Sequence, residues 1–189
     1  DTIAANMPDY RVICFHSRLI STDRAVIERE LSELVGKKST CEKRDKLIVV
    51  GTQVLEQSLD IDFDYMITEL CPMDLLLQRS GRLHRHNRTR PDKLSEPELC
   101  VLIPEDFSKS VYSGWILKQT EKYLPDKLVI PGCIPELVGA VYSEPDNDEQ
   151  QTAEYREYSD EQKEKMQKNA EGGLSASYNI GARYFIREI

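Results

Sequence analysis

The hydrophobic and polar positions change period several times along the first hundred residues of the chain. Four short apolar runs are rich in β-branched residues and typical of buried strands, at residues 11–15, 46–50, 65–69 and 99–103. Between them, residues 22–35 carry apolar side chains at helical spacing before Gly36, and residues 72–86 form a second helix-like stretch. Strands joined through helices predict an α/β fold, with helices on both faces of a parallel sheet.

A different pattern follows residue 106. Residues 111–124 and 134–142 predict two further helices. Residues 143–153 are rich in turn-forming and acidic residues, whereas residues 160–170 are polar on all sides, which favours either a solvent-exposed helix or no stable helix. We therefore expect four parts: an α/β lobe over residues 1–106, a helical extension over 107–143, an acidic linker over 144–173, and the start of a further element over 174–189.

Charge is unevenly distributed along the chain. The 33 acidic residues outnumber the 25 basic ones, and the net charge of −8 by itself disfavours binding to a phosphate backbone. Ten acids against four bases lie between residues 144 and 171, whereas residues 79–93 contain six basic residues and one acid. The acidity therefore belongs to the expected linker, and the lobe keeps a basic patch that suits a nucleic acid.

Cysteine and histidine usage argues against disulfide and metal chemistry. The five cysteines are odd in number, widely spaced and without a C-x-x-C motif, which indicates a reduced, cytoplasmic setting. His84 and His86 lack a third ligand nearby in the sequence, so we interpret them as packing or surface residues and expect no metal site. No apolar run approaches the roughly 20 residues of a membrane span, so we expect no membrane partner.

The sequence Gln-Arg-Ser-Gly-Arg-Leu-His-Arg at residues 78–85 offers the most specific chemistry. If the helix over residues 72–86 continues to its end, Arg82 and Arg85 lie on one face and converge on a single anion. Their guanidinium groups stay charged and bind phosphate oxygens in pairs, and Gly81 lets the backbone pass close to a partner. This arrangement suits the charge of a γ-phosphoryl group during nucleotide hydrolysis. The alternative is an ordinary solvated basic helix end.

A second motif, GTQVLEQSLDID at residues 51–62, follows an apolar strand, where ligand sites of parallel sheets lie. With the arginine motif, it resembles motifs V and VI of the second RecA-like lobe of superfamily-2 helicases. Asp64, the lead-in CPMDLLL at residues 71–77 and the ending LHRH at residues 83–86 are specifically similar to the CRISPR-associated helicase-nuclease of type I interference. The resemblance covers about residues 10–90.

The resemblance implies a RecA-like second lobe, truncated at its N-terminus, of an ATP-dependent translocase on single-stranded DNA. No phosphate-loop motif occurs in the chain, so ATP and Mg²⁺ would be held mainly by a first RecA-like lobe. A nuclease domain and a guide-RNA surveillance complex are the other expected partners, and the chain alone is expected to be inactive. The alternatives are a lobe of a generic superfamily-2 RNA or DNA helicase or restriction motor, and a non-catalytic interaction module.

Roles at the nucleotide follow from the same resemblance. Arg82 and Arg85 would reach the phosphates, and Gln78 would position that region or the attacking water. Asp60 would accept a hydrogen bond from a ribose hydroxyl, and Gly81 would also belong to the nucleotide site. The alternative for Asp60 is a carboxylate that caps a helix or turn.

Roles at the nucleic acid and between the two sites are also implied. Thr52 and the loop of His16, Ser17 and Arg18 would contact the phosphate backbone without reading bases. A threonine that bonds neighbouring backbone and a turn with an exposed arginine are the alternatives. Glu56 and Gln57 would couple the nucleotide and nucleic-acid sites, or belong to an ordinary loop. The loops that follow separate parallel strands are expected to meet at one edge of a single sheet.

Overall fold

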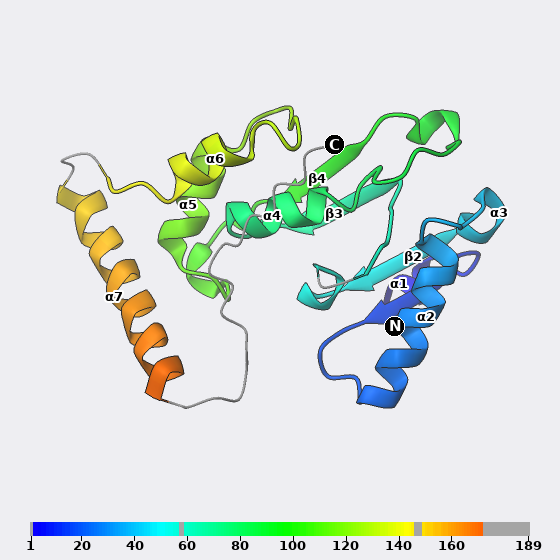
Figure 1. The fold of residues 1–189 in the computed structure, drawn as a ribbon, viewed down its shortest axis with the longest axis horizontal. Coiled ribbons are helices and arrows are strands. Elements are labelled where there is room, and N and C mark those ends of the chain that lie inside the picture. Colours follow the sequence, from blue (N-terminus) through cyan, green and yellow to red (C-terminus); the bar gives the residue numbers. More distant parts are fainter. Residues whose placement is uncertain (1, 57–58, 146–148, 172–189) are drawn as a thin grey trace. The chain divides into compact units, whose positions relative to one another are not determined.

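The computed structural model describes residues 2–56, 59–145 and 149–171 (Figure 1). The chain divides into two compact units, residues 1–143 and residues 144–189. The elements of the first unit are, in order, α1 (Thr2–Asn6), β1 (Arg11–Phe15), α2 (Ser21–Val35), α3 (Cys41–Arg44), β2 (Leu47–Gly51), the 3-10 helix η1 (Gln53–Glu56), β3 (Tyr65–Glu69), α4 (Met73–Ser80), η2 (Asp92–Leu94), β4 (Glu98–Leu102), η3 (Phe107–Lys109), α5 (Gly114–Tyr123) and α6 (Ile134–Val141). The second unit contains α7 (Glu149–Glu171).

The strands β1 and β2 form a parallel ladder that α2 covers (Figure 1). Phe15 from β1, Leu31 from α2 and Ile61 from the segment after η1 are fully buried in one apolar cluster. Helical spacing places the apolar side chains of α2 on one stripe, and this stripe faces the sheet. The cluster thus packs β1 and α2 against the segment around Ile61.

The strands β3 and β4 form a second parallel ladder, beside which α4, α5 and α6 pack (Figure 1). Leu76 of α4 and Leu117 of α5 have no exposed surface, and Trp115 is buried as well. The hydroxyl of Tyr142 donates to Asp74 Oδ1 at 2.6 Å and ties the end of α6 to α4. The helices α5 and α6 therefore belong to the same unit as the four strands.

The expected strands and helices are largely confirmed, with ends shifted by a few residues. One detail of the expected sheet is wrong for the described residues: the four strands pair as two separate two-stranded parallel ladders, β1–β2 and β3–β4, and not as one continuous sheet. The parallel α/β class of the fold is nevertheless confirmed.

The helix expected over residues 72–86 ends six residues early, at Ser80. Beyond Gly81 the backbone pairs with another segment: Phe63 N–H donates to Arg82 O at 2.8 Å, and His84 N–H donates to Phe63 O at 3.0 Å. His84 has a φ of 50°, in the left-handed region, which a continuing right-handed helix excludes. Tertiary hydrogen bonds with Phe63 thus replace the helical ones.

In the second unit, α7 extends from Glu149 to Glu171. Of the two alternatives for residues 160–170, a helix is therefore confirmed, and it already begins within the turn-rich stretch, at Glu149. The four-part division at residues 106, 143 and 173 stays a prediction, and residues 174–189 lie outside the described part of the chain. Within the described residues, no helix is long and apolar enough to cross a membrane, and all five cysteines carry free thiols.

Candidate functional site

The loops after β1 and β2 lie at the same edge, as the sequence predicted. Phe15 pairs with Gly51 in the parallel register, and Thr52 N–H donates to Phe15 O at 3.2 Å. A Cβ on Gly51 would lie 2.1 Å from Leu55 Cδ1, so the turn into η1 is tightly packed. The loop that begins at residue 16 is consequently held next to Thr52.

The side chains at this edge are presented to solvent. Thr52, Ser17 and Arg18 are exposed, and His16 is half-buried. The Arg18 backbone N–H donates to His16 Nδ1 at 3.2 Å, which shapes the loop locally. An exposed hydroxyl pair and a cation at one strand edge have the chemistry of a phosphate-backbone contact.

The residues assigned to coupling are only partly described. Glu56 is the last residue of η1, and Gln57 lies outside the described residues. Within η1, Gln53 Nε2 donates to the hydroxyl of Tyr112 at 2.9 Å, which ties this turn to the segment before α5.

The arginine motif packs on the segment after η1. Arg85 Nε donates to Asp60 Oδ1 at 2.8 Å, and a guanidinium N–H of Arg82 donates to Leu59 O. The two arginines therefore converge through tertiary contacts, and the prediction that they share a helical face is wrong, because α4 ends before them. The exposed Gln78 lies on α4.

Gly81 is the first residue after α4, with a φ of −65°. A Cβ at this position would lie 3.4 Å from the nearest atom of the chain, Gln78 O, which is ordinary van der Waals contact. Packing within the chain therefore does not require glycine here, in contrast to Gly51.

Burial and neighbouring charges shift the pKa values of two groups in this cluster, Asp60 and Arg82. Burial pushes the pKa of Asp60 upward, but the hydrogen bond from Arg85 and the charges of His86 and Arg85 outweigh it, so the pKa lies below its ordinary value. Burial, and then the charge of Arg85, lower the pKa of Arg82, while Asp60 acts in the opposite direction. Arginine's ordinary pKa is high enough that the Arg82 guanidinium remains a cation at neutral pH despite this lowering.

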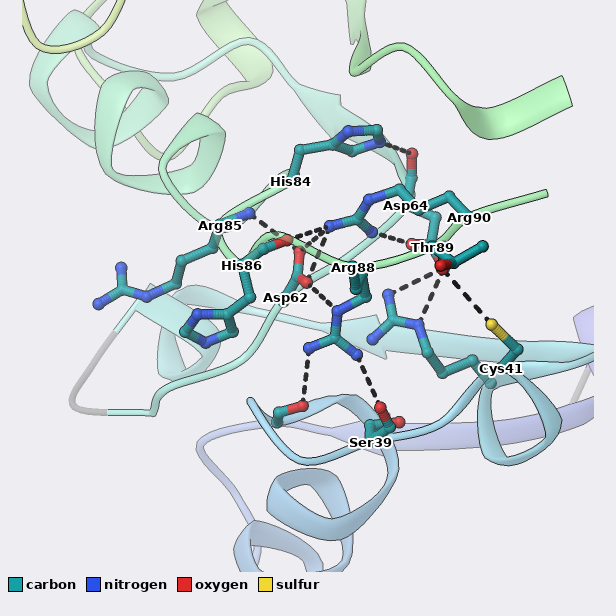
Figure 2. Close-up of polar contacts among 12 residues, drawn as sticks. Ser39, Cys41, Asp62, Asp64, His84, Arg85, His86, Arg88, Thr89 and Arg90 are labelled. Carbon is teal, nitrogen blue, oxygen red and sulfur yellow. Dashed lines mark hydrogen bonds and ion pairs between the residues drawn. The ribbon is translucent and has the colours of Figure 1, made fainter. Parts of the chain in front are cut away.

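A buried charge network adjoins this cluster and was missed by the sequence interpretation (Figure 2). Asp62 has no exposed surface, and both of its oxygens accept from Arg90 Nη2, at 3.0 and 2.9 Å. Arg88 Nε lies 2.7 Å from Asp62 Oδ2 as an ion pair, although its N–H does not point at the oxygen. Arg90 also pairs with Asp64, and Arg44 Nη2 lies 2.8 Å from Asp64 Oδ2.

This network corrects the basic patch expected over residues 79–93. The side chains of Arg88 and Arg90 are 11% and 5% exposed, so their charges face carboxylates and not a nucleic acid. The signal that could have revealed this is the matching alternation of Asp60, Asp62 and Asp64 with Arg88 and Arg90, since alternate residues of extended segments share a face.

The two histidines also contact these acidic residues. His84 Nε2 lies 3.1 Å from Asp64 O, and His86 Nε2 lies 3.0 Å from Asp60 Oδ1. They are therefore part of the polar cluster rather than isolated surface groups. In the part of the chain that the structure describes, no group of three or more potential metal ligands occurs.

Parallel strands whose following loops meet at one edge, with Arg82 and Arg85 bonded to the segment after η1, put the candidate site where open α/β folds bind ligands. The family model "CRISPR-associated nuclease/helicase Cas3, C-terminal" matches residues 2–88. The chain is 45% identical to the Cas3 nuclease/helicase of Streptococcus thermophilus over 141 residues, which cover 71% of this chain and 15% of that protein. Together these matches support a Cas3 C-terminal helicase lobe.

Solved structures agree with this assignment. The crystal structure of T. fusca Cas3-ATP matches with a TM-score of 0.72 and 30% identity, over 90% of this chain and 21% of that chain. The structure titled "CRISPR RNA-guided surveillance complex, pre-nicking" matches with a TM-score of 0.67 and 28% identity, over 89% of this chain and 22% of that one. The chain therefore spans about a fifth or less of the proteins that it resembles.

Proposed function

We propose that this chain is the second helicase lobe of an ATP-dependent helicase that moves along single-stranded DNA in CRISPR interference. The observation that carries the proposal is the contact between the two motifs, in which Arg85 pairs with Asp60 at 2.8 Å and Arg82 bonds Leu59 O. Because of this contact, two arginines and one carboxylate lie together in a single cluster that can face a nucleotide. The likeness to the T. fusca Cas3-ATP structure supports nucleotide binding next to such a lobe.

At the nucleotide, ATP supplies the phosphoryl group, and the residues of this chain stabilise its charge. Arg85 is 42% exposed, so it can exchange its partner Asp60 for a phosphate oxygen at little cost in desolvation. Asp60 is then available to a ribose hydroxyl, Gly81 leaves room for the nucleotide, and Gln78 positions the attacking water. Mg²⁺ is assigned to the first RecA-like lobe, and the isolated chain is accordingly proposed to be inactive.

At the nucleic acid, the exposed residues Thr52, Ser17 and Arg18, with His16, contact phosphates of one DNA strand. Their position at one strand edge and their hydroxyl and cationic groups support this role, because such groups bond phosphate oxygens. Glu56 and Gln57, which lie between Thr52 and Asp60 in the sequence, are proposed to couple the nucleic-acid and nucleotide sites.

The whole-protein context is part of the same proposal. The relatives are named nuclease/helicase, and one similar chain lies in a structure titled as an RNA-guided surveillance complex. We accordingly propose a nuclease domain on the same polypeptide, recruitment by a guide-RNA complex, and a cytoplasmic role in antiviral defence.

The test is Arg85→Ala in the full-length protein. It should lower kcat for DNA-stimulated ATP hydrolysis by at least about a hundredfold, because a finger acts on transition-state charge, while the Kd for ATP stays within roughly tenfold. Lys93→Ala, an exposed cation of the same segment, is the matched control and should leave kcat unchanged. A near-normal kcat for Arg85→Ala would refute the proposed function.

A further inference from the structure

Asp62 holds the backbone of the residue that the proposed function places at the phosphates. Its Oδ1 accepts the backbone N–H of Arg85 at 3.0 Å, in addition to the guanidinium of Arg90 (Figure 2). The carboxylate is completely buried, whereas the side chain of Arg85 is 42% exposed. The backbone of Arg85 is thus held by the Asp62 carboxylate, which is buried away from solvent and nucleotide.

The network also fixes Asp62 and its arginines to the end of α2. Asp62 N–H donates to Val35 O at 2.8 Å, and the guanidinium of Arg88 donates to Gly36 O at 2.9 Å and to Ser39 O at 3.2 Å. A Cβ on Gly36 would lie 2.2 Å from Ser32 O, so the close backbone approach at this turn requires glycine. The segment of Arg85 is therefore tied to a packed helix end.

Arg90 joins the components of the network. Its guanidinium contacts both Asp62 and Asp64 and donates to His86 O at 3.1 Å. The planar guanidinium forms these contacts from several fixed N–H groups at once, which the single ammonium of lysine does not reproduce. The carboxylates of Asp62 and Asp64 are surrounded by three arginines, at positions 44, 88 and 90. Neither carboxylate therefore lacks a cationic partner.

We propose that Asp62 and Arg90, together with Arg88, are positioning residues that hold the backbone of Arg85 where its side chain meets the phosphates. The inference rests on the proposed function. A long side chain acts in the transition state only if its backbone is held, and a displacement of about 1 Å at a reacting group costs up to roughly a hundredfold in rate. Loss of this positioning should lower kcat while leaving the affinity for ATP nearly unchanged.

The experiment is a double-mutant cycle of Arg90→Lys with Arg85→Ala in the full-length protein. Arg90→Lys keeps the buried charge but not the planar fork, and should lower kcat for ATP hydrolysis by about tenfold or more, with KM for ATP within roughly threefold. In the Arg85→Ala background the same change should cost less than about twofold, because no side chain remains to be positioned. Lys93→Ala should change neither background.

A second variant guards against misfolding. Asp62→Asn keeps the size of the side chain and the acceptor for the Arg85 N–H, and it should behave as Arg90→Lys does if the charge pairing sets the position. Equal losses from Arg90→Lys in both backgrounds would assign the network to general stability and overturn the inference. Normal kcat for both Arg90→Lys and Asp62→Asn, with Arg85→Ala impaired, would also overturn it. Failure of the proposed function gives a different result, namely a normal kcat for Arg85→Ala itself.

Discussion

Two neighbouring carboxylates of one segment bind arginine in opposite environments. Asp60 is 55% exposed and pairs with Arg85, whereas Asp62 has no exposed surface and pairs with Arg88 and Arg90. The chemistry is the same, and the difference is access to water. An exposed pair gains little net free energy, about 0–1 kcal/mol, and can therefore exchange partners, whereas breaking a buried pair leaves a charge without solvent or partner.

The comparison separates the two roles that arginine has in this lobe. Arg85 can leave Asp60 for a phosphate because water and the incoming anion compensate for the lost contact. Arg88 and Arg90 cannot do so at comparable cost, and their contribution is geometric. A count of basic residues near the motif therefore overstates the charge that is available to a ligand.

The largest expected effect comes from breaking the buried pair. Asp62→Ala should lower the local free energy of unfolding by about 3–5 kcal/mol, because Arg88 and Arg90 are left buried without their shared carboxylate. Hydrogen–deuterium exchange of the full-length protein would show this as faster exchange of the amides of Asp62, Phe63 and His84. Unchanged protection of these amides, relative to wild type and to Lys93→Ala, would contradict the structural role.

An intermediate effect, on DNA binding, is expected from the exposed Arg18. Arg18→Ala should weaken binding of the full-length protein to two unrelated single-stranded DNAs equally, and should reduce the salt dependence by about one phosphate contact. Arg18→Lys keeps the charge and is the matched control. The measurement is Kd at several salt concentrations, and a loss confined to one DNA sequence would argue for base recognition instead.

The smallest effect on stability is expected at the exposed pair. Asp60→Asn should lower the free energy of unfolding by no more than about 1 kcal/mol at neutral pH. Because the folded pKa of Asp60 is lowered, any stability that it contributes is present above the unfolded pKa and is lost as the pH falls through the folded pKa. Denaturant titrations of wild type and variant from pH 7 into the acid range should therefore converge in strong acid. A difference that grows on acidification would be inconsistent with this pairing.

Local sequence was enough to predict the elements and the identity of the motif loops. The apolar runs at β1, β2, β3 and β4 are short-range patterns, and their parallel connection follows from the helices between them. The adjacency of Thr52 to the loop at residue 16 also followed, because the carboxyl ends of parallel strands share an edge. These predictions depend on periodicity and chain direction, which are properties of the sequence itself.

The end of α4 and the pairing of the acids could not be predicted in this way. The backbone groups of Arg82 and His84 form hydrogen bonds with Phe63 instead of helical ones. Helical periodicity in the sequence contains no information about such a distant partner. Arg90 and Asp62 are 28 residues apart, and Arg88 and Gly36 are 52 apart. Burial decides whether an arginine can bind a ligand or instead forms a structural ion pair inside the lobe. The sequence determined which charges this lobe carries, and only the tertiary structure decided which of them remain accessible, because burial arises from contacts between distant segments.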